Sequence, residues 1–359
     1  MLLSSWFAFG IALMASLLLT WPVRQFALYI GFVDRPSSRK VHLRPMPLLG
    51  GVAIYLGFVI AVAFTLRTGM RTEVLGIIAG ATLLAITGIF DDSGILHHQI
   101  KLFISMPLAA CMLILTGIRA DVFSQIIGGP IGTFSDIALT IFWVVGITAA
   151  FSILDHMDGL CAGIAAVASA FFALSAALNG QSVVCTLAAA ALGASLGFLR
   201  WNFAPAKIFM GDGGAMFLGF LMATLGLKLR PSSAYSPLNW LAPVLILAIP
   251  IFDTTLISIS RSRRGLLPFA TPGKDHTAHR LANLGLGQAR AVLVLYGAAS
   301  ILGICGVMIT SVAAIPGLVA CACLGVLAAL AVIALERSPF EDQRKFAAPA
   351  ENSHQSPDI

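Results

Sequence analysis

Long apolar stretches are the feature that most constrains this chain. Eleven of them follow one another along its 359 residues, near 5–27, 47–66, 74–90, 101–118, 135–151, 160–178, 182–199, 212–229, 239–259, 291–311 and 314–335. The hydrocarbon core of a bilayer is about 30 Å thick and takes roughly 20 apolar residues per helical span. Only 11% of the residues are charged and the mean hydropathy is +0.93, far from the composition of soluble globular domains. The sequence therefore predicts an all-α, polytopic integral membrane protein with about 10–11 transmembrane helices.

Positive charge is divided unevenly between alternate loops of this predicted bundle. Thirteen Lys and Arg residues fall in the loop set that includes residues 30–46 and 260–290, and five fall in the other set (Arg67, Arg71, Arg119, Lys228 and Arg230). Because cytoplasmic loops carry the excess of Lys and Arg, the N-terminus is expected outside and the C-terminus in the cytoplasm. The net charge of +6 reflects the same bias, so it does not indicate nucleic-acid binding.

Composition also suggests how the chain is divided. Residues 1–335 are expected to form a single transmembrane domain, which retains its first helix because no cleavage site follows it. Residues 336–359 are polar and are predicted to form a disordered cytoplasmic tail. The six cysteines fall inside apolar stretches without the spacing of a zinc site, so they are interpreted as packing residues.

Acidic residues gather on the predicted cytoplasmic face. Half of the 16 acids lie in or beside those loops: Asp34, Asp91, Asp92, Asp155, Asp158, Asp212, Asp253 and Asp275. Carboxylates beside a bilayer cost free energy unless they are hydrated, paired or bound to a cation. The alternative interpretation is that these are solvated loop acids that balance nearby Lys and Arg. The sequence around them favours a functional site instead.

Two acid pairs have informative spacing. Asp91 and Asp92 end the apolar run "LLAITGIF", so both can face one site only where the helix terminates; an ordinary polar stop is the alternative. Asp155 and Asp158 in "DHMD" are three apart, which places them on one face of a helical turn and favours a cation or two polar ligand groups between them. Two acids stabilised by the dipole at a helix N-terminus are the alternative there.

Asp212 stands inside "FMGDGGAMFLGF", where glycines surround a single carboxylate. Glycines let a ligand approach the backbone and leave amide groups free at a helix start for phosphate. Mg²⁺ takes oxygen ligands, commonly one or two carboxylates together with substrate phosphates. Dispersed Asp residues without Cys or His metal spacing therefore favour a magnesium-bound diphosphate over zinc.

Two basic loops complete the pattern. "DRPSSRKVHLRPMPLLGG" contains Arg39, Lys40, His42 and Arg44, and "SRSRRGLLPFATPGKDHTAHRL" contains His276 and His279. Charged loops beside the membrane can set the topology of the protein and attract anionic lipid, and this would explain the arginines. It would not explain the histidines.

The motifs, taken in order, resemble a known family. "DRPSSRKVHLRPMPLLGG", "GIFDD" followed by Lys101, "DHMDGL", "NFAPAKIFMGDGGAMFLGF", "PIFDTTLISISRSRRG" and "GKDHTAHRL" are similar to motifs of the polyprenyl-phosphate N-acetylhexosamine-1-phosphate transferases, or glycosyltransferase family 4. The resemblance runs from about Asp34 to Arg290 and is greatest to the undecaprenyl-phosphate GlcNAc-1-phosphate transferase branch.

The resemblance implies a Mg²⁺-dependent phosphoglycosyltransferase, with Mn²⁺ as an alternative metal. It would transfer an N-acetylhexosamine 1-phosphate from a UDP-sugar to polyprenyl phosphate, release UMP and start a lipid-linked cell-envelope glycan. The active site would lie on the cytoplasmic face of a multi-pass protein of the inner membrane. The sugar, the glycan pathway, a one-step or two-step mechanism and a homodimer are left open.

Roles carry over from the family motifs to matching positions. Asp212, with Asp91 and Asp92, matches the metal ligands. The catalytic set implied is Asp91, Asp92, Asp155, Asp158, His276 and His279. The substrate-binding set implied is Arg39, Lys40, His42, Arg44, Lys101, Asn202, Lys207 and Phe209, with Asn202 and Phe209 on the nucleotide side.

Three positions depart from the family pattern. Ala149 and Ser152 stand where Asn is common, and His156 stands where Gly is common. "HTAHRL" also lacks the consecutive histidines of the pentapeptide-transferring branch, which favours a GlcNAc-like sugar. The alternatives are phospho-N-acetylmuramoyl-pentapeptide transfer, a membrane transporter, or a catalytically silent scaffold.

Overall fold

The computed structural model describes residues 2–35, 45–66, 72–96, 98–230, 237–266, 273–310 and 314–338. Its elements are α1 (Leu2–Tyr29), β1 (Val33–Asp34), β2 (Met46–Pro47), α2 (Gly50–Thr65), α3 (Thr72–Asp92), α4 (His98–Ile100), the π-helix η1 (Lys101–Ser105), α5 (Met106–Leu115), α6 (Phe123–Ile126), α7 (Gly129–Leu154), α8 (Leu160–Leu178), α9 (Ser182–Asn202), α10 (Gly211–Lys228), the 3-10 helix η2 (Pro237–Trp240), α11 (Leu241–Ile246), α12 (Ala248–Arg263), α13 (Thr277–Leu281), the π-helix η3 (Ala282–Leu286), α14 (Gln288–Ile309) and α15 (Ala314–Glu336).

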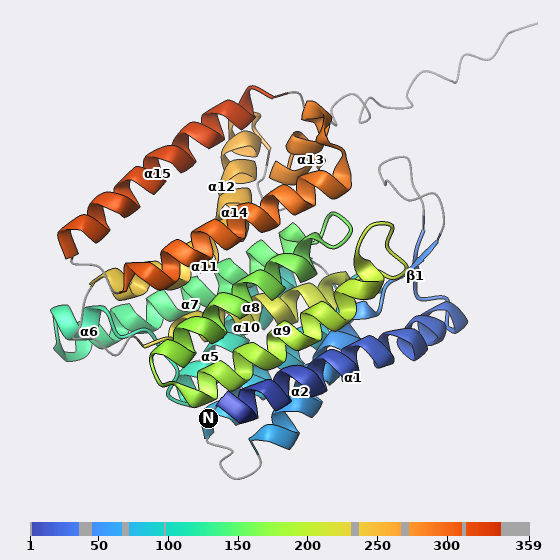
Figure 1. Ribbon diagram of the computed structural model, residues 1–359, viewed down its shortest axis with the longest axis horizontal. Helices are drawn as coiled ribbons and strands as arrows, with labels where there is room; N and C mark the ends of the chain where they lie inside the picture. The colour runs from blue at the N-terminus through green and yellow to red at the C-terminus, as the bar shows by residue number, and fades with distance from the viewer. Residues whose placement is uncertain are drawn as a thin grey trace, which may run out of the picture.

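The prediction of an all-α, polytopic membrane protein is confirmed (Figure 1). Seven helices within the described ranges are long and apolar enough to span a bilayer: α1, α3, α7, α8, α9, α14 and α15. The other predicted stretches correspond to shorter or interrupted helices, namely α2, η1 with α5, α10, and α11 with α12. The small β1–β2 hairpin is antiparallel and pairs Val33 with Pro47.

Helix α10 occupies the centre of the bundle. Every residue from Gly213 to Leu227 is buried, and α2, α3, α7 and α8 pack around it. The Phe217 ring meets Tyr55 and Phe58 of α2 edge-on, each with ring centroids 5.5 Å apart. A helix that is apolar on all sides is a core helix. Its first turn, which carries Asp212, lies against the start of α2 and the end of α3.

Glycines bring those neighbouring helix ends into backbone contact with α10. A Cβ on Gly51 would overlap the backbone of Gly214, and one on Gly88 would overlap the backbone of Asp212 and Gly213. Gly211 has φ +74°, a conformation that L side chains rarely adopt. The end of α3 thereby reaches the first turn of α10.

Backbone hydrogen bonds fix the start of α2 to the same place. The Phe209 amide donates to the Pro47 carbonyl at 2.8 Å, and the Gly50 amide donates to the Phe209 carbonyl at 3.0 Å. The Gly51 amide donates to the Met210 carbonyl at 2.8 Å. The segment before α10 is thus held in position by the residues after β2.

The ninth predicted stretch is broken between α11 and α12 at Leu247. Pro250 explains the break, because it has no N–H to donate to the Ile246 carbonyl and its ring would clash with that carbonyl in a continuous helix. The interruption gives α12 its own direction. It carries Asp253 on its second turn.

The two ends of the bundle are distinct (Figure 1). The β1 strand and α13 lie toward one end and α6 lies at the opposite end. This separation agrees with the predicted alternation of loops between the two ends of the bundle. Which end faces the cytoplasm stays a prediction. Outermost α15 runs beside α12 and ends at Glu336; of the predicted tail, residues 339–359 lie outside the described residues.

We predict that Gly88→Ala lowers the thermal stability of the purified protein, because the new methyl group meets backbone atoms that cannot rotate away. Overpacking of this kind typically costs about 1–3 kcal/mol. Gly146→Ala in α7 is the matched control, since nothing lies within 4 Å of its added Cβ. Thermal unfolding in detergent, followed by size-exclusion chromatography, measures both. Equal melting temperatures for the two variants would contradict the close helix contact.

Candidate active site

Three helix ends place a group of acids around one lysine. Asp91 and Asp92 are the last residues of α3, Asp212 lies in the first turn of α10, and Lys101 begins η1. The Lys101 Nζ donates to Asp91 Oδ2 at 2.6 Å and to Asp212 Oδ2 at 2.5 Å. The Asp212 amide donates to Asp92 Oδ1 at 3.1 Å. Both acids of the "DD" pair thus face one site, as the end of a helix allows.

The second oxygen of Asp212 is also occupied. The Ser152 hydroxyl of α7 donates to Asp212 Oδ1 at 2.7 Å. Asp212 therefore has a cation on one oxygen and a hydroxyl on the other. Ser152 was singled out in the sequence only as a departure from the family pattern, and its contact shows that a small hydroxyl supports the site directly.

The expectation that Asp155 and Asp158 share one face of a helical turn is wrong. Helix α7 ends at Leu154 and α8 begins at Leu160, so both acids lie on a non-helical connection. Asp158 Oδ2 accepts from the Ala206 amide at 2.9 Å. Burial raises the pKa of Asp155 to about 7, and the nearby charges of Asp212 and Asp158 add to the effect. Asp155 therefore belongs to the Asp212 cluster, while Asp158 holds a neighbouring loop.

Asn202 and Tyr296 both hold the connection between α7 and α8. Asn202 also holds the connection between α9 and α10. Asn202 Oδ1 accepts from the Gly159 amide at 3.0 Å, and its Nδ2 donates to the Ile208 carbonyl at 3.0 Å. The Tyr296 hydroxyl donates to the Gly159 carbonyl at 2.5 Å. Gly159 has φ +75°, which favours glycine at this turn. The Asn202 amide thus joins residues 155–159 to the segment before α10.

Two predicted substrate-binding residues lie on that segment. Phe209 is half-buried directly before the start of α10. The Lys207 ammonium lies over the Trp201 ring, 5.7 Å from its centroid. The Lys207 carbonyl accepts from Arg24 Nε of α1 at 3.0 Å. The described contacts of Lys207 are therefore with α1 and the end of α9 rather than with the acids.

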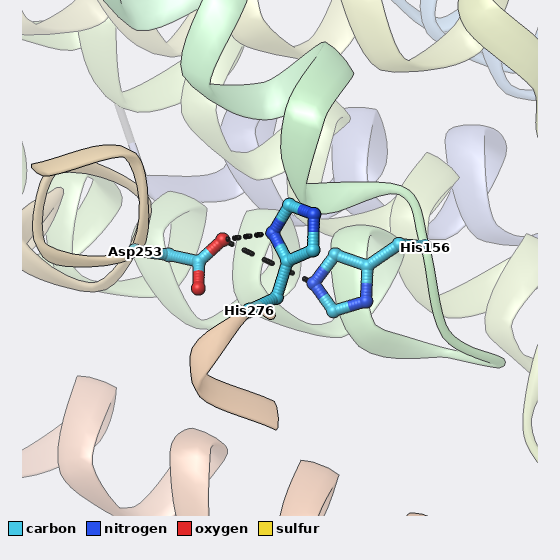
Figure 2. A group of neighbouring side chains, drawn as sticks. All are labelled: His156, Asp253 and His276. Atoms are coloured by element: carbon cyan, nitrogen blue, oxygen red, sulfur yellow. Dashed lines mark hydrogen bonds and ion pairs between the residues drawn. The ribbon is translucent and has the colours of Figure 1, made fainter. Parts of the chain in front are cut away.

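A second cluster contains histidines (Figure 2). His276 Nδ1 lies 2.9 Å from Asp253 Oδ2, and the Thr277 amide donates to Asp253 Oδ1 at 2.7 Å. The His156 ring stacks on His276 with centroids 4.0 Å apart, and His279 lies 4.7 Å from His156. Burial lowers the pKa of His156 well below its ordinary value and that of His279 to about 4, and in both cases the charge on His276 adds to the effect. Both imidazoles are therefore neutral near pH 7.

Arginine–carboxylate bonds connect this cluster to the end of the chain. Arg261 donates to both oxygens of Asp275, at 2.8 and 3.2 Å, and Arg264 pairs with the same carboxylate. Burial alone would raise the pKa of Asp275, but Arg261 and Arg264 hold it at about 2. Buried Arg280 donates to the Asp275 carbonyl at 2.7 Å and to Glu336 of α15 at 2.8 Å. The segment 273–281 is thereby locked to α12 and α15.

Among the four side chains of the histidine cluster, His156, Asp253, His276 and His279, the sequence analysis left two out of the predicted site. Asp253 was counted only among the acids of one face, although a lone carboxylate in "LAIPIFDTTLI" is itself a signal of function. His156 was noted only as a departure from the family pattern. Arg39, Lys40, His42 and Arg44 lie outside the described residues, so their roles stay predictions.

Comparisons with known proteins find a family and several relatives that match the chain. The model of "Glycosyl transferase family 4" matches residues 74–230, which include the acids of α3 and α10 and the connection after α7. The chain is 37% identical over 312 residues to the Bacillus subtilis protein named "Probable undecaprenyl-phosphate N-acetylglucosaminyl 1-phosphate transferase", covering 85% of this chain and 84% of that protein.

Two further relatives come from other bacterial groups. The decaprenyl-phosphate N-acetylglucosaminephosphotransferase of Mycobacterium tuberculosis is 33% identical over 311 residues, 77% of this chain and 75% of that protein. The undecaprenyl-phosphate alpha-N-acetylglucosaminyl 1-phosphate transferase of Escherichia coli K12 is 28% identical over 295 residues, 79% of this chain and 78% of that protein. The matches to these relatives cover most of the chain. The chain therefore belongs to glycosyl transferase family 4.

Proposed function

We propose that the chain transfers N-acetylglucosamine 1-phosphate from UDP-N-acetylglucosamine to a polyprenyl phosphate, with Mg²⁺, at the cytoplasmic face of the inner membrane. In the net reaction an oxygen of the lipid phosphate forms a bond to the phosphorus next to the sugar. The bond from that phosphorus to the bridging oxygen of UMP breaks, and UMP leaves. The names of the relatives support the sugar and the lipid acceptor.

One observation carries this proposal: the carboxylates of Asp91 and Asp212 converge on a single cation. One ammonium nitrogen lies 2.6 Å from an oxygen of Asp91 and 2.5 Å from an oxygen of Asp212. Two carboxylates this close repel each other unless positive charge lies between them. The same helix ends therefore form a site that selects cations, beside glycine-flanked backbone suited to phosphate.

The donor set of this site fits Mg²⁺. Its members are carboxylate oxygens, from Asp91, Asp92 and Asp212, and Mg²⁺ prefers oxygen ligands shared with substrate phosphates. When bound, the ion would neutralise charge that develops on the transferring phosphoryl group. Asp92 accepts the Asp212 amide and so fixes the backbone at the start of α10.

Lys101 then has two roles, and which one applies depends on whether a divalent cation is bound to Asp91 and Asp212. With its ammonium between Asp91 and Asp212, it neutralises them. A divalent cation on the same oxygens would displace this ammonium, because the two positive charges repel each other at such short distance. The displaced ammonium remains beside the metal, where a diphosphate brings negative charge. We assign Lys101 to the diphosphate after displacement.

The nucleotide is assigned to the connections beside the acids. Asp158 and Asn202 hold residues 202–208 against the turn after α7. This support positions the half-buried Phe209 ring at the start of α10, where it would stack on uracil. An aromatic face of this kind contributes apolar contact and orientation to a bound base.

The first test is UMP release by detergent-purified protein supplied with undecaprenyl phosphate, Mg²⁺ and a panel of UDP-N-acetylhexosamines. We expect turnover with UDP-N-acetylglucosamine that EDTA abolishes. Turnover confined to UDP-N-acetylmuramoyl-pentapeptide would support the pentapeptide transferase instead. Silence across the panel with folded protein would favour the transporter alternative or the scaffold alternative. The scaffold is motivated by Ala149 and Ser152, which stand where the family commonly has Asn.

We predict that Asp212→Asn lowers turnover by about 10²–10³-fold or more while the protein stays folded, because an amide cannot neutralise the metal or hold Lys101 as an ion pair. Asp121→Asn is the control. It removes an exposed carboxylate that pairs with Arg230 in the other loop set, and turnover should be unchanged. Retained metal-dependent turnover in Asp212→Asn would overturn the metal assignment.

Replacing Lys101 by Gln should separate metal binding from turnover. Removal of the competing ammonium is expected to tighten Mn²⁺ binding, measured by electron paramagnetic resonance, by about 1 kcal/mol or roughly fivefold. Turnover at saturating metal should fall, because the diphosphate loses its cation. Lys228→Gln, which breaks an equally short pair with Glu73 at the other end of α10, serves as the control and should change neither quantity. Weaker Mn²⁺ binding in Lys101→Gln would contradict the displacement.

A further inference from the structure

The histidine cluster presents a second set of possible metal ligands, built from three separate segments. His156 lies in the turn between α7 and α8, Asp253 lies on α12, and His276 directly precedes α13. One ligand atom from each residue lies within 4.8 Å of the other two. Figure 2 shows a ring nitrogen of each histidine directed toward the Asp253 carboxylate. The three side chains thus converge on one point.

The His156 ring makes no hydrogen bond within the described part of the chain that accounts for its position. Neither ring nitrogen has a hydrogen-bond partner among the described residues, and both are buried. Nε2 lies 3.9 Å from Asp253 Oδ2, beyond hydrogen-bond distance, and the side chain is only 13% exposed. An unsatisfied buried polar group costs about 1–3 kcal/mol. A ligand that binds Nε2 would remove that cost for one of the two nitrogens.

The other two side chains are already oriented. Asp253 uses Oδ1 to accept the Thr277 amide, so its Oδ2 is the oxygen that faces both histidines. His276 directs Nδ1 at that oxygen, and its Nε2 lies 3.4 Å from Arg261. Hydrogen bonds to the remaining atoms of metal ligands fix their orientation in metal sites. Thr277 supplies such a bond for Asp253.

We propose that His156, Asp253 and His276 bind a divalent transition metal ion, with Zn²⁺ as the expected ion. Two imidazole nitrogens and one carboxylate oxygen form a donor set that zinc accepts and magnesium does not favour. Three protein ligands leave a fourth position for water or a substrate oxygen. This ion is distinct from the one assigned to Asp91 and Asp212, and the proposal does not depend on the transfer reaction.

Metal binding requires two rearrangements. The first is that the His156 and His276 rings, stacked at an interplanar angle of 28°, turn so that both nitrogens meet the ion in their ring planes. The second concerns the proton of His276. The ion takes the place of the hydrogen between His276 Nδ1 and Asp253 Oδ2, and the ring keeps its proton on Nε2 instead. Arg261 Nη2 is a donor and cannot stay against the Nε2 proton, so its 3.4 Å contact with the ring must open while its two bonds to Asp275 can remain. Both Arg261 and Arg264 pair with Asp275, so the charge of Asp253 is left to face the incoming ion.

Cobalt is the probe for this site. Tag-free, full-length protein in detergent is stripped with EDTA, returned to buffer with excess Mg²⁺ to fill the oxygen site, and titrated with Co²⁺. We expect visible d–d absorption that saturates at one equivalent and is displaced by Zn²⁺ but not by more Mg²⁺. A thiolate charge-transfer band would show that cysteines hold the metal and would overturn the proposal, as would the lack of saturable absorption.

Matched variants assign the ligands. His156→Phe keeps a planar ring against His276 but has no nitrogen, so it preserves the stacking and should lower Zn²⁺ affinity at least about 100-fold. His276→Asn should do the same. His279→Gln is the control, because His279 lies beside the cluster but outside the ligand set, and its affinity should be unchanged. Undiminished affinity in His156→Phe would refute the site even if His276→Asn fails to fold.

Discussion

A half-buried negative charge at the start of the central helix is the constraint on which the site depends. Asp212 lies in the first turn of α10, whose following residues are enclosed by apolar side chains. Such a charge is costly unless it is paired and hydrogen-bonded. The surroundings supply the Lys101 ammonium on one oxygen and the Ser152 hydroxyl on the other. The helix ends that contribute these groups must therefore meet at this point.

Glycine makes that meeting possible. The backbones of α2 and α3 touch the first turn of α10 at Gly51 and Gly88, where a side chain would collide with backbone atoms. Three residues beyond Gly88, α3 ends with its two acids. Small residues in helix contacts of membrane proteins allow such close approach. Here the close approach places charged groups as well as packing surfaces, so helix packing and site geometry have the same cause.

The sequence predicted most of the fold and only part of the site, for physical reasons. Runs such as 160–178 became helices with the same bounds, because bilayer thickness and apolar length are strong local constraints. The break at Leu247 depends on Pro250, a single residue within an apolar run. The turn at Asp155 could not be read from i, i+3 spacing, since spacing does not show where a helix ends. Partners such as Lys101 for Asp212, 111 residues apart, come only from tertiary packing.

The turn between α7 and α8 connects the two clusters. Asp155 is close enough to Asp212 for its charge to act there, the next residue stacks on His276, and Asp158 accepts from the Ala206 amide. Successive side chains can diverge in this way because the backbone is not helical. A ligand that orders one of these contacts restricts the dihedral angles of the others, since the three residues lie within a span of four. An ion held by His156 would thus limit the positions open to Asp155, and the chemistry of the acid cluster would depend on a side chain outside it.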